Sequence, residues 1–595
     1  MLSENKNEIL KLKKEIDKLK AELQSLKKSK KFGLVWEDRE REHGIDSEDH
    51  YPYFVKKGEE FNIDNGDCDK NLLIEGDNYH ALEILNYTHS EKIDVIYIDP
   101  PYNTGKKKEF RYGDRWIDEN DGYRHSYWLS FMNKRLKLAK KLLTKEGVIF
   151  ISIDDHEQAR LKLLCDDVFG KNNFISCLVW NQKTGTQSGH FTGSHEYILV
   201  YAKDKMQLPY FEDSEGENIR HGALKKISPK NPPSEFTFPK GFEFRAEDGK
   251  ELSGSWGGAE KTTLISGRMI AKDGKLIEDV TLFAGWAMKS QMKQWIYGDK
   301  ENTYDTKGQK VLKFYFNGSG VLWYEKERKT QHPKTVIEAG GTIVGSNELK
   351  EIFSDIDELP FKYPKPLSLI KKIIGYATNK KKSPIVLDFF AGSGTTAHAI
   401  LELNKEDGGS RKFILCTNNE NNICEEVTYQ RIKKVIEGYE ITKPKTKTKP
   451  QQVINIEGTG SSLEYLKIDM LSRNDEKYAE LDIKDFLVDK CVEIIQVKES
   501  CFELSPMSDF LLRLNKPNKS VYILKNIYSM SKEDYNKTIS IIDQSDESEV
   551  TLYILSLQNH EHYKQRFTNC KKHIIFEPLP EKFLKVLRKI QRNRK

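Results

Sequence analysis

Apolar runs alternate with helical periods along residues 71–153 of the chain. The stretches IDVIYID (93–99) and VIFISID (148–154) are β-branched and almost fully apolar, which is typical of strands inside a parallel sheet. Between them, residues 127–147 have the spacing of a long amphipathic helix that closes at Gly147. This alternation predicts a doubly wound α/β domain.

The alternation returns after residue 359 and predicts a second block of the same domain. The helices and strands expected there are 366–378, 383–392, 395–404, 411–417 and 427–439. Between the blocks, residues 183–358 are rich in Gly, Lys, Trp, Tyr and Thr and have no clear helical period. SHEYILVYAKD (194–204) is expected to be a strand within this segment. We therefore expect an inserted domain with its own role.

At 595 residues the chain is too long for one hydrophobic core. The expected parts are an N-terminal heptad helix (1–31), the α/β domain in two blocks (32–182 and 359–440), the insert (183–358), a Lys-, Thr- and Pro-rich linker (441–452) and a C-terminal α+β domain (453–595). The C-terminal part carries no chemical motif.

The first segment has apolar residues at alternating steps of three and four, which is a coiled-coil pattern. They are Ile9, Leu12, Ile16, Leu19, Leu23 and Leu26. A single helix lying on its own domain and a self-associating pair both fit this pattern, and the second is slightly favoured.

The net charge and the cysteine pattern exclude few classes of protein. A net charge of +5 is small beside 96 basic and 91 acidic residues, so the overall balance does not indicate a nucleic-acid partner. No signal region or transmembrane run is present, and the eight cysteines lack metal-ligand spacing. These features predict a reduced cytoplasmic protein without a metal site.

A glycine loop follows the strand of the second block. In VLDFFAGSGTTAHAI (386–400), Gly392, Gly394 and Ala397 fit the spacing G-x-G-x-x-G/A between a strand and a helix. A tight structural turn would also use glycines, but the context favours a nucleoside-containing cofactor. The loop alone does not separate NAD from S-adenosylmethionine. Around it, Asp388, Phe390, Thr395 and Thr396 are further candidates, and Glu420 is the candidate acid for a ribose diol.

The strand of the first block ends in the sequence DPPY, Asp99 to Tyr102. Prolines cannot donate to a sheet ladder, so the strand must stop there. A proline-terminated strand with a surface acid is the simpler interpretation. Together, however, DPPY and FAGSGTT resemble the amino-group DNA methyltransferases, which transfer a methyl group from S-adenosylmethionine to an exocyclic amine of a base.

The resemblance implies a role for each residue of DPPY. The side chain of Asp99 and the carbonyl of Pro100, held in direction by Pro101, accept the two N–H bonds of the amine. The ring of Tyr102 stacks on the base, which must first leave the duplex. Aspartate at the first position favours adenine over cytosine, although the same acceptors could polarise either amine.

The order of the motifs resembles the β-class arrangement, with DPPY first and the cofactor loop about three hundred residues later. The resemblance implies a Rossmann-like methyltransferase sheet in circularly permuted order, with the insert as target recognition domain. It also implies that Asp77, in EGDN, lies near the cofactor adenine. Lys365 and Pro366, in YPKPLSLI, would help to wall the cofactor pocket.

More closely, residues from about 10 to 440 resemble the Mod subunit of type III restriction–modification systems. The resemblance implies a homodimer that binds double-stranded DNA, methylates adenine N6 and joins a helicase–nuclease Res subunit. The basic and aromatic insert is expected to contact DNA. Two alternatives stay open: a solitary methyltransferase, and a catalytically silent DNA-binding scaffold.

Overall fold

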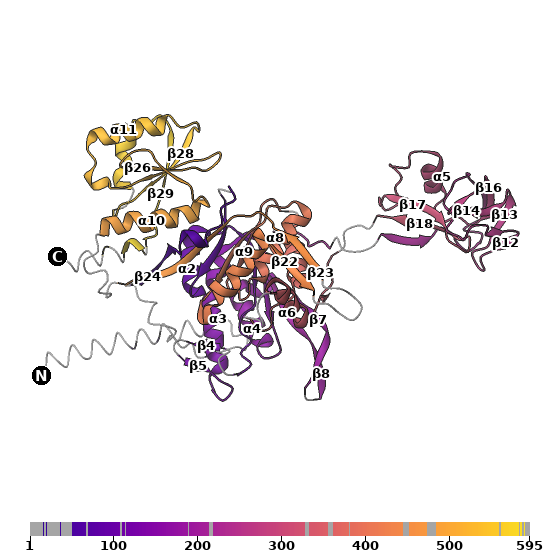
Figure 1. Ribbon diagram of the computed structural model, residues 1–595, viewed down its shortest axis with the longest axis horizontal. Coiled ribbons are helices and arrows are strands. Elements are labelled where there is room, and N and C mark those ends of the chain that lie inside the picture. Colours follow the sequence, from indigo (N-terminus) through magenta and orange to yellow (C-terminus); the bar gives the residue numbers. More distant parts are fainter. Residues whose placement is uncertain are drawn as a thin grey trace. The chain divides into compact units, whose positions relative to one another are not determined.

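The structure is a computed structural model that describes most of residues 50–588, together with Ile16, Lys20 and Trp36. The gaps are 67–68, 107–109, 113–114, 189, 214–217, 328–331, 355–360, 380, 444–451, 473–482, 559–560, 582 and 586–587. Apart from Ile16 and Lys20, the expected heptad helix lies outside the described residues. The chain separates into two compact units, Tyr210–Pro333 and the remainder (Figure 1).

The larger unit is built on a ten-stranded mixed sheet. In spatial order its strands are β1 (His50–Lys56), β24 (Leu463–Ser472), β2 (Asn71–Glu75), β21 (Lys412–Thr417), β20 (Ile385–Asp388), β3 (Ile93–Ile98), β6 (Leu143–Ile153), β8 (Phe191–Ala202), β7 (Phe174–Ser188) and β19 (Val336–Glu338). The six strands from β24 to β6 are parallel to one another. The predicted α/β class is confirmed.

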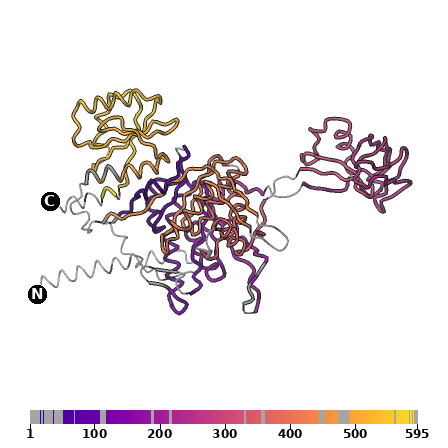
Figure 2. The backbone as a smooth tube through the Cα atoms, viewed as in Figure 1, coloured from indigo at the N-terminus to yellow at the C-terminus, as the bar shows by residue number. Residues whose placement is uncertain are grey.

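Strands from before and after the insert lie side by side in this sheet. Val386 and Leu387 of β20 pair with Val95 and Ile96 of β3, and Figure 2 shows indigo and orange backbone interleaved in the central layer. All four residues are fully buried. The apolar runs that predict central strands therefore form the middle of the sheet.

Helices cover this sheet. Those before residue 210 are α2 (Asn78–Thr88), α3 (Arg124–Leu142) and α4 (Gln158–Cys165), and those after residue 334 are α6 (Thr342–Ile352), α7 (Leu367–Thr378), α8 (Thr395–Asp407) and α9 (Gln430–Glu437). The predicted end of α3 at Gly147 is wrong. The helix stops at Leu142 because Leu143 pairs with Ile93 and so starts β6.

The compact insert is narrower than the expected segment 183–358. Strand β8, expected inside the insert, runs antiparallel to β6 with Val148 opposite Ala202, and β19 pairs with β7. The apolar end of β8, residues 198–202, is buried in the large sheet, which explains why β8 is part of this sheet and not of the insert. The assignment of a recognition role to the insert stays a prediction.

The insert, Tyr210–Pro333, holds three small antiparallel sheets around an aromatic core. Their strands are β9 (Ile219–Gly222), β10 (Ser234–Phe238), β11 (Glu251–Leu252), β12 (Ser255–Trp256), β13 (Thr262–Ser266), β14 (Met269–Lys272), β15 (Lys275–Leu276), β16 (Val280–Ala284), β17 (Val311–Phe316) and β18 (Leu322–Lys326). One helix, α5 (Lys289–Tyr297), lies in a region whose sequence shows no clear helical period.

The C-terminal part forms a separate five-stranded sheet, β25 to β29, but its first two strands, β23 and β24, pair with strands outside this sheet. Strand β24 joins the large sheet, while β23 (Gln452–Glu457) pairs with β22 (Gly438–Lys443), so both ends of the expected linker 441–452 are strand. From residue 483 onward, α10 (Ile483–Glu499), α11 (Lys532–Asp543) and α12 (Glu561–Lys564) accompany β25 (Leu504–Pro506), β26 (Leu511–Leu514), β27 (Ser520–Leu524), β28 (Glu549–Ile554) and β29 (His573–Glu577). Within the described ranges, no helix has the length and apolar character to span a membrane.

Candidate active site

The carboxyl ends of β3 and β20 meet at one edge of the sheet because the two strands are parallel neighbours. Asp99 follows β3 directly, and Asp388 is the last residue of β20. In an open parallel sheet this edge, where strand order reverses, is where ligands bind. The two motifs of the sequence are therefore brought to one place.

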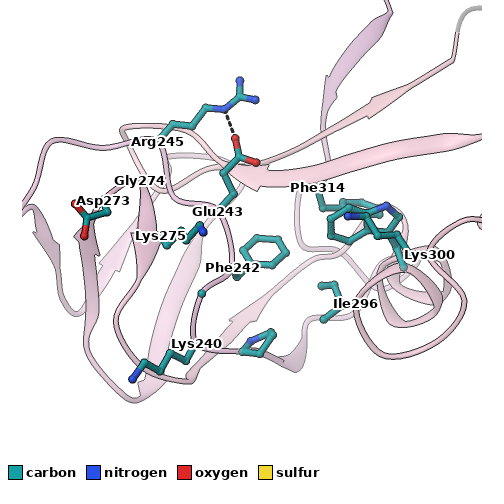
Figure 3. A pocket seen from close by; sticks show the side chains of 13 residues that line it. Lys240, Phe242, Glu243, Arg245, Asp273, Gly274, Lys275, Ile296, Lys300 and Phe314 are labelled. Atoms are coloured by element: carbon teal, nitrogen blue, oxygen red, sulfur yellow. Dashed lines mark hydrogen bonds and ion pairs between the residues drawn. The ribbon is translucent and has the colours of Figure 1, made fainter.

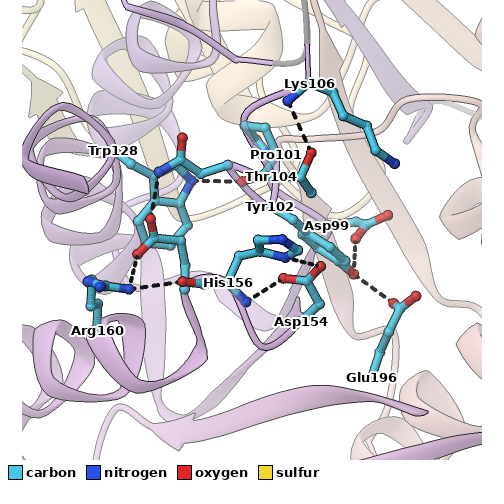
Figure 4. Close-up of polar contacts among 12 residues, drawn as sticks. Asp99, Pro101, Tyr102, Thr104, Lys106, Trp128, Asp154, His156, Arg160 and Glu196 are labelled. Carbon is cyan, nitrogen blue, oxygen red and sulfur yellow. Dashed lines mark hydrogen bonds and ion pairs between the residues drawn. The ribbon is translucent and has the colours of Figure 1, made fainter. Parts of the chain in front are cut away.

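Asp99 is the centre of a compact polar cluster. The Lys365 ammonium donates to both Asp99 oxygens, at 2.9 Å to Oδ1 and 2.8 Å to Oδ2. The Tyr102 hydroxyl lies 2.9 Å from Asp99 Oδ1 and 3.0 Å from Glu196 Oε2, as Figure 4 shows. Lys365 is also 3.6 Å from Glu196. The carboxylates of Asp99 and Glu196 thus share the Lys365 ammonium and the Tyr102 hydroxyl.

Burial and charge act against each other in this cluster. Burial lowers the pKa of Lys365, but the nearby carboxylates of Asp99 and Glu196 outweigh it and raise this pKa above its usual value. Burial raises the pKa of Tyr102 far above its usual range, and the same two carboxylates raise it further. Lys365 is therefore held as an ammonium and Tyr102 as a neutral phenol.

The backbone after Asp99 is fixed by side chains from other elements. The Trp128 indole of α3 donates to the Pro101 carbonyl at 2.7 Å (Figure 4). Asn103 has a left-handed backbone, φ 57°, and its amide donates to the fully buried Glu157 at 2.6 Å. Glu157 also contacts the His125 ring. These contacts fix the Pro101 carbonyl and the backbone at Asn103 that follows it.

The glycine loop uses the left-handed backbone that its sequence predicts. Gly392 has φ 49° and Gly394, which caps α8, has φ 76°. The Thr428 hydroxyl donates to the Gly392 carbonyl at 2.6 Å. A fully buried guanidinium, Arg431, donates to Thr395 Oγ1 at 2.8 Å. Two residues of the segment after β21, Thr428 and Arg431, therefore hold the glycine loop in place by hydrogen bonds.

Asp388 supports this loop from the end of β20. Its oxygens accept from the Phe390 N–H at 2.9 Å and from the Thr396 hydroxyl at 2.5 Å. Burial raises the pKa of Asp388 to about 7; the two hydrogen bonds lower it only partly, and Asp99 raises it further. Asp388 is 2% exposed, and its hydrogen bonds to Phe390 and Thr396 both go to residues of the loop. Asp388 therefore stabilises the glycine loop.

This raised pKa makes the effect of Asp388 on stability depend on pH. The native pKa of about 7 exceeds the ordinary 3.8, so the unfolded chain loses this proton first and stability falls between these two pH values. We expect Asp388→Asn to melt at a higher temperature relative to wild type at pH 8 than at pH 5, with the gap widening by a few degrees. Thermal melts at both pH values measure this gap, and an unchanged gap would contradict the assignment.

The other cofactor candidates are less closely grouped. Asp77 caps α2 by accepting from the Tyr79 N–H at 2.7 Å and pairs with Arg135 at 3.3 Å. Pro366 caps α7 and is buried. Glu420 lies beyond β21 in a single exposed 3₁₀ turn. The structure thus joins Lys365 to Asp99, and leaves Glu420 at the surface.

Several residues of the site lie outside the two motifs, and the sequence alone did not identify them as site residues. Glu196 comes from β8, and Thr428 and Arg431 come from the segment after Glu420. Asn78 donates to the Phe389 carbonyl at 2.8 Å and links α2 to the glycine loop. Asn78 and Glu196 lie in two segments that belong to the resemblance, EGDN and SHEYILVYAK, but neither residue was singled out there. Across the described residues, no cluster of three His, Cys, Asp or Glu side chains could hold a metal ion.

A family model of DNA methylases, N6_N4_Mtase, matches residues 93–429, which include DPPY, the insert and the glycine loop. The chain belongs to the N6/N4 DNA methylase family. Membership confirms the resemblance drawn from the two motifs. The matched residues begin at β3 and end just after β21 in the order of the sequence. They include Thr428, which contacts the glycine loop.

Relatives of this DNA methylase include the type III restriction–modification enzyme StyLTI Mod subunit of Salmonella typhimurium, 35% identical over 61% of this chain. The type II methyltransferase M.KpnI of Klebsiella pneumoniae is 32% identical over 60% of this chain and 85% of its own length. The matched part of the chain spans only 55–58% of the length of the first type III Mod subunits. Among solved structures, the PvuII cytosine-N4 DNA methyltransferase matches 61% of this chain and 90% of its own at 11% identity, with TM-score 0.31.

Proposed function

We propose that the chain is an S-adenosylmethionine-dependent DNA methyltransferase that modifies adenine N6, and that it serves as the modification subunit of a type III restriction–modification system. The observation that carries this proposal is the pairing of β3 with β20. It brings an ionisable acceptor, Asp99, and a strand–glycine–helix loop, Gly392 and Gly394, to one edge of the sheet.

The residues at this edge suit transfer to an exocyclic amine. Such a nitrogen is a poor nucleophile because its lone pair is delocalised into the ring. Asp99 and the Pro100 carbonyl accept its two N–H bonds and draw it towards tetrahedral geometry. The ring of Tyr102 holds the base, which has to leave the duplex to reach this site. The proton that the amine loses on transfer passes towards the Asp99 carboxylate.

The glycine loop fits a nucleoside-containing methyl donor. A Cβ on Gly392 would lie 3.3 Å from the Phe361 ring, and one on Gly394 would lie 3.3 Å from Thr428, so a side chain at either position would press on the residues that surround the loop. Residues that would hold the donor are Gly392, Gly394, Phe390 and Thr395 around the loop, with Asp77 and Pro366 at its sides. When bound, S-adenosylmethionine supplies the methyl group as an electrophile.

The insert carries a cavity of about 610 Å³ with charged and aromatic walls. Figure 3 shows Lys240, Lys275 and Lys300 around Phe242 and Phe314. These three lysines form no ion pair among the described residues, although Lys300 lies 4.6 Å from the Trp295 ring centroid. Unpaired lysines are suited to DNA phosphates, which supports the proposal that the insert contacts double-stranded DNA.

One experiment tests the modified base, its position and its sequence context together. The chain is expressed in a host free of DNA methylation, and the host DNA is sequenced by single-molecule reads that detect modified bases. We expect N6-methyladenine in one short asymmetric motif. N4-methylcytosine instead would overturn the adenine assignment, and unmodified DNA from soluble protein would overturn the proposed activity.

A solitary methyltransferase is the second candidate, and the match to 85% of the type II methyltransferase M.KpnI favours it. The type III proposal implies a homodimer and a helicase–nuclease Res partner, and the first relatives are named as Mod subunits of type III restriction–modification enzymes. Purification of the tagged chain from its native source separates the two. A stoichiometric helicase–nuclease supports the type III assignment, and its absence from active enzyme supports the solitary one.

A further inference from the structure

Lys365 and Tyr102 together make three contacts with the Asp99 carboxylate. The single Tyr102 proton is donated either to Asp99 or to Glu196. An ionised carboxylate offers about four acceptor positions, two on each oxygen. Lys365 takes one on Oδ1 and one on Oδ2, and the Tyr102 hydroxyl lies within hydrogen-bond distance of Oδ1. One position on Oδ2 is left. The carboxylate therefore has a defined direction in which it can accept a further N–H.

We propose that Lys365 is a positioning residue for methyl transfer, which fixes Asp99 so that the remaining acceptor position on Oδ2 receives the target amine. Glu196 completes the arrangement by holding both Lys365 and the Tyr102 hydroxyl. This inference rests on the proposed function and deepens it. Motif resemblance places Lys365 in the wall of the cofactor pocket, whereas the geometry places it on the catalytic acid.

The surroundings of Lys365 support a fixed position. Its side chain is 9% exposed, and its ammonium lies 5.0 Å from the Tyr102 ring centroid and 5.9 Å from that of Trp180. Gln182 donates to Glu196 Oε1 at 2.8 Å and so fixes the second carboxylate. A buried ammonium with two partly buried carboxylate partners has little freedom, because each charge depends on the others.

The charge of the cluster also suits the reaction. Lys365 contributes +1 and Asp99 and Glu196 contribute −1 each, which leaves −1 beside an amine that becomes positive as the methyl group arrives. Fixed charge of opposite sign stabilises such a developing charge. Other titratable groups interact with Asp99 and are unchanged by the variants below: Tyr97 and Tyr102 on its own segment and Asp388 from β20.

The first test replaces the ammonium. We expect Lys365→Met to lower kcat by about 100-fold, as misplacement of one reacting group does, with S-adenosylmethionine affinity unchanged by calorimetry. The acid limb of the kcat–pH profile should move to higher pH, because a nearby positive charge favours the ionised form of Asp99. Lys365→Arg, which keeps the charge, should return the limb to its wild-type position.

Lys381→Met is the matched control. Lys381 pairs at 2.8 Å with Asp94, which lies at the opposite end of β3 from Asp99. Removal of this ammonium deletes a lysine–aspartate pair from the same strand, so kcat and its pH profile should remain those of wild type. Thermal melts of both variants show whether folding is affected equally.

Glu196→Gln gives an independent test with the opposite sign. Its amide carbonyl still accepts from Tyr102, but one negative charge near Asp99 is lost, so the acid limb should move to lower pH. Limbs that move in opposite directions support the proposal. Unchanged kcat and pH profile in Lys365→Met, or shifts of the same sign in both variants, would overturn it. An inactive wild type would instead refute the proposed function.

Discussion

We expect Asp99→Ala to lower methyl transfer to DNA by about 1,000-fold or more, the scale of losing a preorganised polar group at a reacting atom. The structure gives the reason, because the Asp99 carboxylate lies directly after β3 and both Lys365 and Tyr102 bind it. Its loss also leaves Lys365 facing Glu196 alone. Transfer of a tritiated methyl group measures the effect.

The affinity for S-adenosylmethionine should stay within about twofold of wild type in this variant, since the glycine loop is held by Asp388, Thr428 and Arg431. Asp94→Asn is the matched control at the other end of the strand, and it should keep its activity. Full transfer by Asp99→Ala would remove the assignment of DPPY as the catalytic stretch.

The second large effect is expected at Gly394, where Gly394→Asp should weaken cofactor binding by about tenfold or more. The residue has φ 76°, and an added Cβ would lie 3.3 Å from Thr428 Cγ2 and 3.4 Å from its carbonyl oxygen. Backbone strain of about 1–3 kcal/mol and the displaced Thr428 both distort the loop. Calorimetric titration with S-adenosylmethionine measures the loss.

Gly408→Asp provides a close control for this substitution. Gly408 caps the other end of α8, also with a left-handed backbone at φ 68°, but a Cβ there meets nothing within 4 Å. The same new side chain in the same backbone conformation should leave cofactor affinity unchanged. Equal losses in both variants would show that helix stability, and not the loop, determines binding.

The sequence predicts the two central strands well because their apolar runs are complete. IDVIYID and VLDFF are buried on both sides, so their place inside a parallel sheet follows from composition, and the meeting of Asp99 with the glycine loop follows from strand polarity. Gly392 and Gly394 are equally predictable, since their left-handed backbone angles are ones that glycine adopts most readily.

The partners of Asp99 could not be predicted in the same way. Lys365 lies 266 positions away and reaches Asp99 from the segment before α7. Glu196 lies on a strand whose sequence fits the insert as well as the sheet, and only pairing with β6 decides between them. Both contacts depend on which strand lies next to which, and local patterns of apolar and polar residues do not specify that.

The pairing of β1 with β24 has a consequence for synthesis of the chain. Tyr53 donates to Asp469 at 2.8 Å across 416 positions, and β2 lies between β24 and β21. At about 5–20 residues per second a ribosome needs roughly 25–95 s to reach the end of β24. Until then β1 lacks the strand it pairs with, and β2 lacks one of its two neighbours. The insert forms a compact unit of its own and can fold before β24 is made, so we expect the edge of the large sheet that β1 and β2 form to stay exposed to aggregation during synthesis.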